Sequence, residues 1–147
     1  MLLRAILSAF IGTAMMTISS QTEMIIEERE ASPTPGKAAQ KFLSLFGFKI
    51  TSEKTFNVLS TWTHWIYGTF WGIVFYFLIL LNIDIFLTGL LYLLIVWVTA
   101  QIILPFMGVA KPAWQYGGKA LVTDLFHHLV YAASTTAGWI LIGESIS

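Results

Sequence analysis

The fold of this chain is decided by residues 70–104, which read FWGIVFYFLILLNIDIFLTGLLYLLIVWVTAQIIL. This stretch contains one charged side chain, Asp84, and two apolar runs separated by Asn82-Ile83-Asp84. A helix needs about 20 mostly apolar residues to cross a hydrocarbon layer of roughly 30 Å. The sequence therefore predicts membrane-spanning helices over about 56–81 and 85–104, and the short link makes them antiparallel neighbours.

The composition of the whole chain agrees with this interpretation. Of its 147 residues, 56% are hydrophobic and 11% are charged, and the formal net charge is zero. Soluble domains carry about 25% charged residues. The high hydrophobicity excludes a disordered chain, and the zero net charge argues against a nucleic-acid partner. The absence of cysteine excludes a disulfide scaffold and iron–sulfur chemistry, which leaves a single integral membrane domain spanning 1–147.

Two further segments have the length and composition of spanning helices, about 2–20 and about 121–142. The first could be mistaken for a signal peptide because Arg4 precedes its apolar run. That run ends in Ser-Ser-Gln-Thr-Glu without a small-x-small cleavage site, so we interpret it as a retained helix. The predicted fold is all-α, a four-helix transmembrane bundle.

The long polar loop over 21–55 is predicted to contain a short helix of its own, over about 35–46. Thr34 is expected as its N-cap and Pro35 at its first helical position. Lys37 and Lys41 lie on one side of this helix and apolar residues on the other, a pattern typical of a helix that lies in the membrane interface. Most basic residues lie in this loop and in the loop after residue 104, and Arg4 alone lies on the other side. The positive-inside rule then makes both loops cytoplasmic and both termini extracytoplasmic.

Two of the predicted helices share a motif, His64-x-x-Tyr67-Gly68 and His128-x-x-Tyr131-Ala132. Residues three apart lie on one helix face, so each helix turns an imidazole and a phenol the same way. The parallel suggests a duplicated helix pair and favours His128 over His127 as the inward-facing histidine. Small residues continue each face, and they permit close helix approach: Gly68, Gly72, Ala132, Ala133, Ala137 and Gly138.

Other polar groups lie at a similar depth, and together with the two motifs they predict a polar layer in the cytoplasmic third of the bundle. These groups are Thr17, Gln21, Glu23, Gln101, Asp124 and His127. Ionisable side chains at membrane depth usually face the bundle interior. The simplest interpretation is that these side chains hydrogen-bond one another and hold the helices together.

Three other uses of the layer are open. His64 and His128 could be the axial ligands of a haem, with Tyr67 and Tyr131 beside it. A metal ion could instead be bound by His64, Asp124, His128 and Glu23, with Glu27 nearby, although the paired Glu-x-x-His motif of di-iron bundles is absent. His and Asp could also relay protons for transport of a small solute, which would require an oligomer.

The longer pattern resembles small bacterial inner-membrane proteins related to YagU. The resemblance rests on Gly12-Thr13, Ser32-Pro33-x-Pro35-Gly36-Lys37-Ala38-Ala39, His64-Trp65-x-Tyr67-Gly68-Thr69-x-Trp71-Gly72, Pro105-x-x-Gly108 and Asp124-x-x-His127-His128-x-x-Tyr131. It implies a four-helix protein of the bacterial inner membrane and supplies no reaction. The small-residue faces and the high aromatic content favour a structural or accessory subunit without assigned catalytic residues, which packs against itself or against a larger membrane complex.

Overall fold

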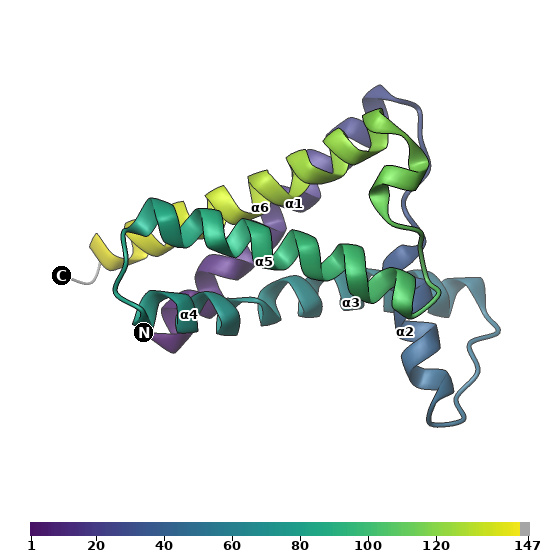
Figure 1. The fold of residues 1–147 in the computed structure, drawn as a ribbon. Coiled ribbons are helices and arrows are strands. Elements are labelled where there is room, and N and C mark those ends of the chain that lie inside the picture. Colours follow the sequence, from purple (N-terminus) through teal and green to yellow (C-terminus); the bar gives the residue numbers. More distant parts are fainter. Residues whose placement is uncertain (145–147) are drawn as a thin grey trace.

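A computed structural model describes residues 1–144, and this part of the chain is helical without any strand. Figure 1 shows the helices in chain order. They are α1 (Leu2–Ile26), α2 (Thr34–Ser44), α3 (Glu53–Phe70), α4 (Gly72–Leu80), α5 (Ile85–Phe106), the 3-10 helix η1 (Ala113–Tyr116) and α6 (Gly118–Glu144).

Within residues 1–144, four segments are long and apolar enough to cross a membrane: Leu2–Ile26, Glu53–Leu80, Ile85–Phe106 and Gly118–Gly143. The predicted all-α bundle with four membrane spans is thus confirmed, and the chain is a polytopic membrane protein. Each span extends beyond the predicted bounds at one or both ends. At α1 the extra residues continue the helix past Ser20 to Ile26.

The four spans pack around one core, in which the first and last helices are neighbours. The α1–α6 interface is the most extensive, α5 packs against α6 and α4, and α1 also contacts α3 and α4. The N-terminus, the α4–α5 connection and the last turns of α6 lie at one end of the molecule (Figure 1). Half of the core side chains are aromatic, and Phe75 makes edge contacts with Tyr92 and Trp139 at centroid distances of 5.0 and 6.0 Å.

Small residues bring α1 unusually close to its neighbours. The buried residues of α1 are Ala5, Ser8, Ala9, Gly12 and Thr13. A Cβ atom at Gly12 would collide with the Thr135 hydroxyl and lie 2.8 Å from the Tyr131 carbonyl oxygen. A Cβ atom at Gly72 would lie 2.8 Å from the Ala5 carbonyl oxygen. Lipid supplies no hydrophobic force between helices. Close packing of this kind must therefore hold the helices together.

The predicted small-residue faces are used differently on the two helices. On α3 and α4, Gly68 and Gly72 pack against α1 inside the bundle. On α6, Ala132 and Gly138 are buried, whereas Ala133 and Ala137 are exposed on the outer surface. The expectation of one continuous small face on α6 was therefore wrong, because its inward face runs through Thr135 and Thr136 instead.

The second span was predicted as one helix over about 56–81, but it is interrupted at Trp71, between α3 and α4. The Trp71 amide lies 3.4 Å from the Tyr67 carbonyl oxygen, a long helical bond. The Gly68 carbonyl oxygen accepts a hydrogen bond from the Tyr131 hydroxyl at 2.6 Å. Glycines on either side and a side chain that inserts into the ladder are recognised causes of a helix break.

The predicted helix in the first loop is present as α2, and it begins one residue earlier than expected. Pro33 occupies the N-cap, so Thr34 is already helical and its predicted capping role was wrong. The helix packs against α3. A Cβ atom at Gly36 would lie 2.5 Å from the ring of Phe56, so this contact depends on glycine.

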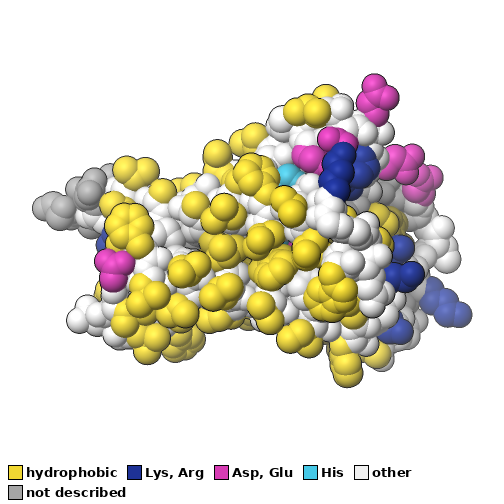
Figure 2. Space-filling view, turned by 45° about the horizontal axis from the view of Figure 1, so that its top comes forward, with side chains coloured by type: hydrophobic (Ala, Val, Ile, Leu, Met, Phe, Trp, Pro, Cys, Tyr) yellow, Lys and Arg dark blue, Asp and Glu magenta, His cyan; other side chains and the backbone are white. Residues whose placement is uncertain are grey.

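Charged side chains gather at one end of the molecule, and the surface between the ends is mostly hydrophobic (Figure 2). At the charged end, Lys119 of α6 pairs with Glu27, the residue after α1. At the opposite end, the Arg4 side chain donates to the Trp139 carbonyl oxygen, with a distance of 2.7 Å from Nε, and lies over the Trp139 ring. A cationic side chain, Lys119 or Arg4, thus links α1 and α6 at each end of the helix pair.

Replacing Gly12 by alanine should destabilise the bundle, because the added methyl group separates α1 from α6. We expect Gly12→Ala to lower the free energy of unfolding by about 1–3 kcal/mol. Titration of the detergent-solubilised protein with SDS, followed by circular dichroism, measures this change. Gly118→Ala is the matched control, since a Cβ atom there meets nothing within 4 Å. Equal stability of the two variants would contradict the prediction.

Candidate functional site

The predicted polar layer is divided into separate groups, each linking particular helices. The group nearest the middle of α6 is a pair of tyrosines. Tyr131 is only 2% exposed, and its hydroxyl donates to the Gly68 carbonyl oxygen at 2.6 Å. The Tyr92 and Tyr131 hydroxyl oxygens are 2.6 Å apart. Because the Tyr131 proton is already used, Tyr92 is the donor, and the pair joins α5, α6 and α3.

A second, independent hydrogen bond links His64 of α3 to α1. Its Nε2 lies 3.0 Å from the Thr17 hydroxyl, which itself donates to the Thr13 carbonyl oxygen at 2.7 Å. The hydrogen between them is therefore carried by His64 Nε2. This nitrogen would have to break its bond to Thr17 before it could bind a metal or haem iron.

The adjacent histidines of α6 have different partners. His127 Nδ1 lies 2.8 Å from the Ser19 hydroxyl of α1, whereas His128 Nδ1 lies 2.8 Å from the Asp124 carbonyl oxygen of its own helix. The two side chains are 9% and 13% exposed. Both side chains are thus turned inward, and His127, which the sequence parallel did not favour, is the one with a hydrogen bond to another helix.

His127 also lies beside the acidic end of α1. Its Nε2 is buried without a hydrogen-bond partner, 4.0 Å from Glu23 Oε2. The same Glu23 oxygen accepts from Arg29 at 2.5 Å. This hydrogen bond raises the pKa of Arg29, which lies beyond the membrane span. Glu23 is therefore held by an ion pair at the charged end of the bundle, where Figure 2 shows a histidine among acidic and basic groups.

Asp124 organises the loop between α5 and α6. Its Oδ2 accepts from Trp97 Nε1 at 2.7 Å and from Gln101 Nε2 at 2.8 Å. The other end of the Gln101 amide accepts from the Ala113 backbone N–H at 2.7 Å. One carboxylate thereby fixes the end of α5, the start of α6 and η1 relative to one another.

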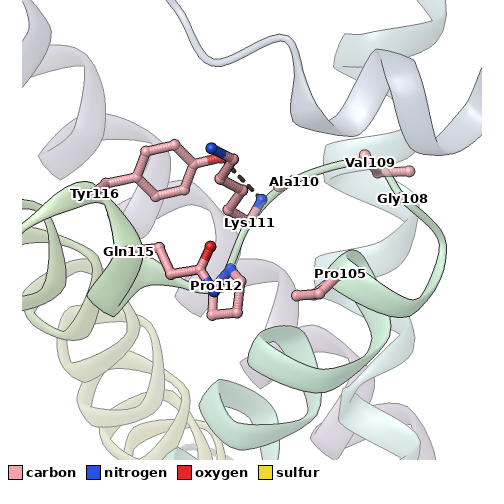
Figure 3. A pocket seen from close by; sticks show the side chains of 8 residues that line it. All are labelled: Pro105, Gly108, Val109, Ala110, Lys111, Pro112, Gln115 and Tyr116. Atoms are coloured by element: carbon pink, nitrogen blue, oxygen red, sulfur yellow. Dashed lines mark hydrogen bonds between the residues drawn. The ribbon is translucent and has the colours of Figure 1, made fainter.

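The loop positioned by this network borders an open surface hollow of about 440 Å³ (Figure 3). Its walls come from the turn after α5 and from η1. The Lys111 backbone N–H donates to the Tyr116 hydroxyl across it at 2.9 Å. The prolines and glycines of this region predicted an irregular loop, but they gave no signal for the hollow.

The residues predicted for haem or metal binding are distributed among these groups. Tyr131 is buried and bonded to Tyr92, while Tyr67 is 47% exposed, so the two His-x-x-Tyr motifs do not present equivalent faces. Within residues 1–144, no group of three or more His, Asp or Glu side chains could hold a metal ion. Glu23 approaches His127 rather than His64 or His128. The haem and metal hypotheses stay predictions without support from this geometry.

Sequence reasoning did not select three residues that complete these groups: Ser19, Tyr92 and Trp97. Trp97 lies four residues before Gln101, so the two share a helix face, and that spacing was a usable signal. Tyr92 is a phenol inside an apolar span, where its hydroxyl needs a partner. Ser19 carried no signal, because serine at helical spacing commonly bonds its own backbone.

Comparison with known proteins adds no relative to this description. No family model matches the chain, and neither the curated proteins nor the solved structures include a match. The function is therefore argued from the geometry of the molecule, and the resemblance to YagU-related proteins stays a prediction.

The tyrosine pair predicts an asymmetric effect of removing either hydroxyl. Tyr131→Phe removes two hydrogen bonds and leaves buried polar groups without that partner, so we expect a loss of about 1–3 kcal/mol. Tyr92→Phe removes only one bond and should cost about 0.6 kcal/mol, the average for such contacts in membranes. The double variant should cost less than the sum. Unfolding in SDS measures all three, and equal losses for the single variants would contradict the proposed donor direction.

The Asp124 network predicts a local effect on the loop. Asp124→Ala frees Gln101, so the Ala113 backbone N–H should lose its protection and exchange its hydrogen faster. Hydrogen–deuterium exchange with mass spectrometry of the peptide covering η1 measures this. Asp84→Ala is the control, because Asp84 accepts from the Phe86 and Leu87 amides at the start of α5. Asp84→Ala should raise hydrogen exchange at the start of α5 and leave exchange at η1 unchanged. If η1 still exchanges slowly in Asp124→Ala, the proposed role of the Asp124 network is refuted.

Proposed function

We propose that this protein is a structural or accessory membrane subunit, which packs against itself or against a larger membrane complex. The observation that supports the proposal is an apolar groove of about 400 Å³ on the outer surface between α1 and α3. We name it the α1–α3 groove, and it is lined by Ile6, Phe10, Trp62, Trp65, Ile66, Thr69, Phe70 and Ile73.

The groove is open and lined almost entirely by apolar side chains, which suits contact with a transmembrane helix. Trp62, Ile66 and Phe70 follow one another at a spacing of four residues, so they form a ridge along α3 that is largely exposed. Phe10 of α1 forms the other side and contacts Trp65 at a centroid distance of 5.1 Å. Aromatic side chains bury large areas at low entropic cost, and they are enriched where proteins bind one another.

The interior of the bundle supports the same proposal. A ligand-binding or redox centre would bring His64, Asp124, His128 and the tyrosines to one cavity. Here His64, Asp124, His128 and Tyr131 each have a hydrogen bond inside the fold, to a neighbouring helix or to their own backbone, and Tyr67 lies apart from them, half exposed. Polar groups used in this way stabilise helix packing, and the outer surface is left to provide the specific interaction.

The proposal includes a location. The charged end, which carries Lys37, Lys41, Lys111 and Lys119, is assigned to the cytoplasm by the positive-inside rule. Both termini would then be extracytoplasmic. Kinship with the YagU-related proteins would put the molecule in the bacterial inner membrane.

Association through the α1–α3 groove should depend on Phe70. Phe70→Ala removes an aromatic ring from the ridge, and we expect it to weaken association about tenfold, equivalent to about 1.4 kcal/mol. For self-association, Förster transfer between labelled copies diluted in liposomes measures the dissociation constant. For a larger complex, native electrophoresis of mildly solubilised membranes measures the fraction of the protein in the large species.

Phe77→Ala is the matched control, because Phe70 and Phe77 are both 60% exposed on the same span and Phe77 lies outside the groove. It should leave association unchanged. A wild-type protein that stays monomeric in both assays would refute the proposal. Equal weakening by the two variants would refute the role of the groove.

A further inference from the structure

We propose that α2 and the turn after it form a binding surface for anionic phospholipid headgroups, separate from the α1–α3 groove. The helix presents three faces. Gly36, Ala39 and Leu43 lie on one side, at intervals of three and four residues, and they are buried or partly buried where α2 packs against α3. This contact uses only part of the apolar surface of α2.

The second face of α2 is apolar and has no partner within the described chain. Phe42, Leu45 and Phe46 lie three and four residues apart, and each is more than half exposed. The rings of Phe42 and Phe46 pack edge to face at a centroid distance of 5.3 Å. We name these three residues the aromatic face. An exposed apolar surface of this kind marks an interaction site.

The turn after α2 gives the aromatic face a fixed direction. Gly47 has a φ of +83°, which a residue with a side chain rarely adopts. Its backbone N–H donates to the Ser44 carbonyl oxygen and that of Phe48 to the Leu43 carbonyl oxygen, both at 3.1 Å. This is the Schellman pattern of hydrogen bonds. It holds Phe48, which is also largely exposed, next to the aromatic face.

The position of α2 in the chain puts this surface at the membrane boundary. The helix lies between the end of one span at Ile26 and the beginning of the next at Glu53. Its anchor on α3 is Phe56, in the first turn of that span. The aromatic face is therefore near the level at which lipid headgroups meet the acyl chains, where amphipathic helices bind.

The charges beside the aromatic face select an anionic partner. Residues 34–54 contain one acidic residue, Glu53, and four lysines: Lys37, Lys41, Lys49 and Lys54. Within residues 1–144, these lysines take part in neither of the two lysine or arginine salt bridges, which are Arg29–Glu23 and Lys119–Glu27. Lys37 and Lys41 lie on the third face of α2, next to Leu45 on the helical wheel. Lysines in this position can reach headgroup phosphates while the apolar side chains enter the acyl region.

The absence of cysteine allows a direct test, because one introduced cysteine takes one nitroxide label. Phe46→Cys places the label on the aromatic face. Gln40→Cys, on the exposed polar side of α2, is the matched control. Collision of each label with oxygen and with a water-soluble nickel complex measures its immersion in nanodiscs of phosphatidylcholine, with or without phosphatidylglycerol.

We expect the label at residue 46 to be immersed and the label at residue 40 to be in water. Phosphatidylglycerol should raise the immersed fraction at residue 46. Lys37→Gln and Lys41→Gln should each lower the ratio of membrane-immersed to water-exposed label at residue 46 about fivefold in nanodiscs that contain phosphatidylglycerol. In phosphatidylcholine alone, neither substitution should change this ratio.

Three results would overturn the inference. Equal water exposure at residues 40 and 46 in both lipids would show that α2 does not bind the bilayer. Equal immersion with and without phosphatidylglycerol would exclude recognition of anionic headgroups. Broadening of the nitroxide spectrum that increases with the number of copies per nanodisc would assign the aromatic face to a second copy of the chain.

Discussion

The close approach of α1 to α6 is the contact on which the rest of the bundle depends. Small side chains on α1 let the two backbones meet, and Gly12 lies directly against the α6 backbone at the Tyr131 carbonyl. In lipid, burial of apolar surface gives no advantage over contact with acyl chains, so dispersion and hydrogen bonds must hold the helices. The α1–α6 pair then supplies the surfaces on which α3, α4 and α5 assemble.

Hydrogen bonds between helices add to the stability that this packing provides. Thr17, Ser19 and Glu23 succeed one another along α1 and face polar groups of two other helices. Such groups need partners inside the protein, because the hydrocarbon layer offers no water; most have one, and His127 Nε2 has none. The result is several separate hydrogen-bonded groups between helices, and these polar side chains do not meet in one cavity. This arrangement suits a molecule that keeps its shape while its surface interacts with something else.

The architecture was predictable from sequence because spans and amphipathic faces are periodic. Residues 70–104 predicted two spans, and the residues around Pro35 predicted α2. The break at Trp71 was not predictable, since it coincides with the Tyr131 hydroxyl on Gly68, a contact 63 residues away in sequence. The hydrogen bond between His127 and α1 was missed for a similar reason. Adjacent residues on a helix point about 100° apart, and only the position of α1 decides which of the two histidines bonds to it.

The pairing of the first span with the last has a consequence for biosynthesis. While the chain is being inserted, α1 enters the bilayer with Ser8 and Gly12 on a face whose partner on α6 has not yet been made. The two interacting segments are separated by nearly the full length of the chain, so their contact closes the largest loop in the fold. The α1–α6 contact can therefore form only after the last of these spans has been made, and until then this face of α1 meets lipid or the insertion machinery.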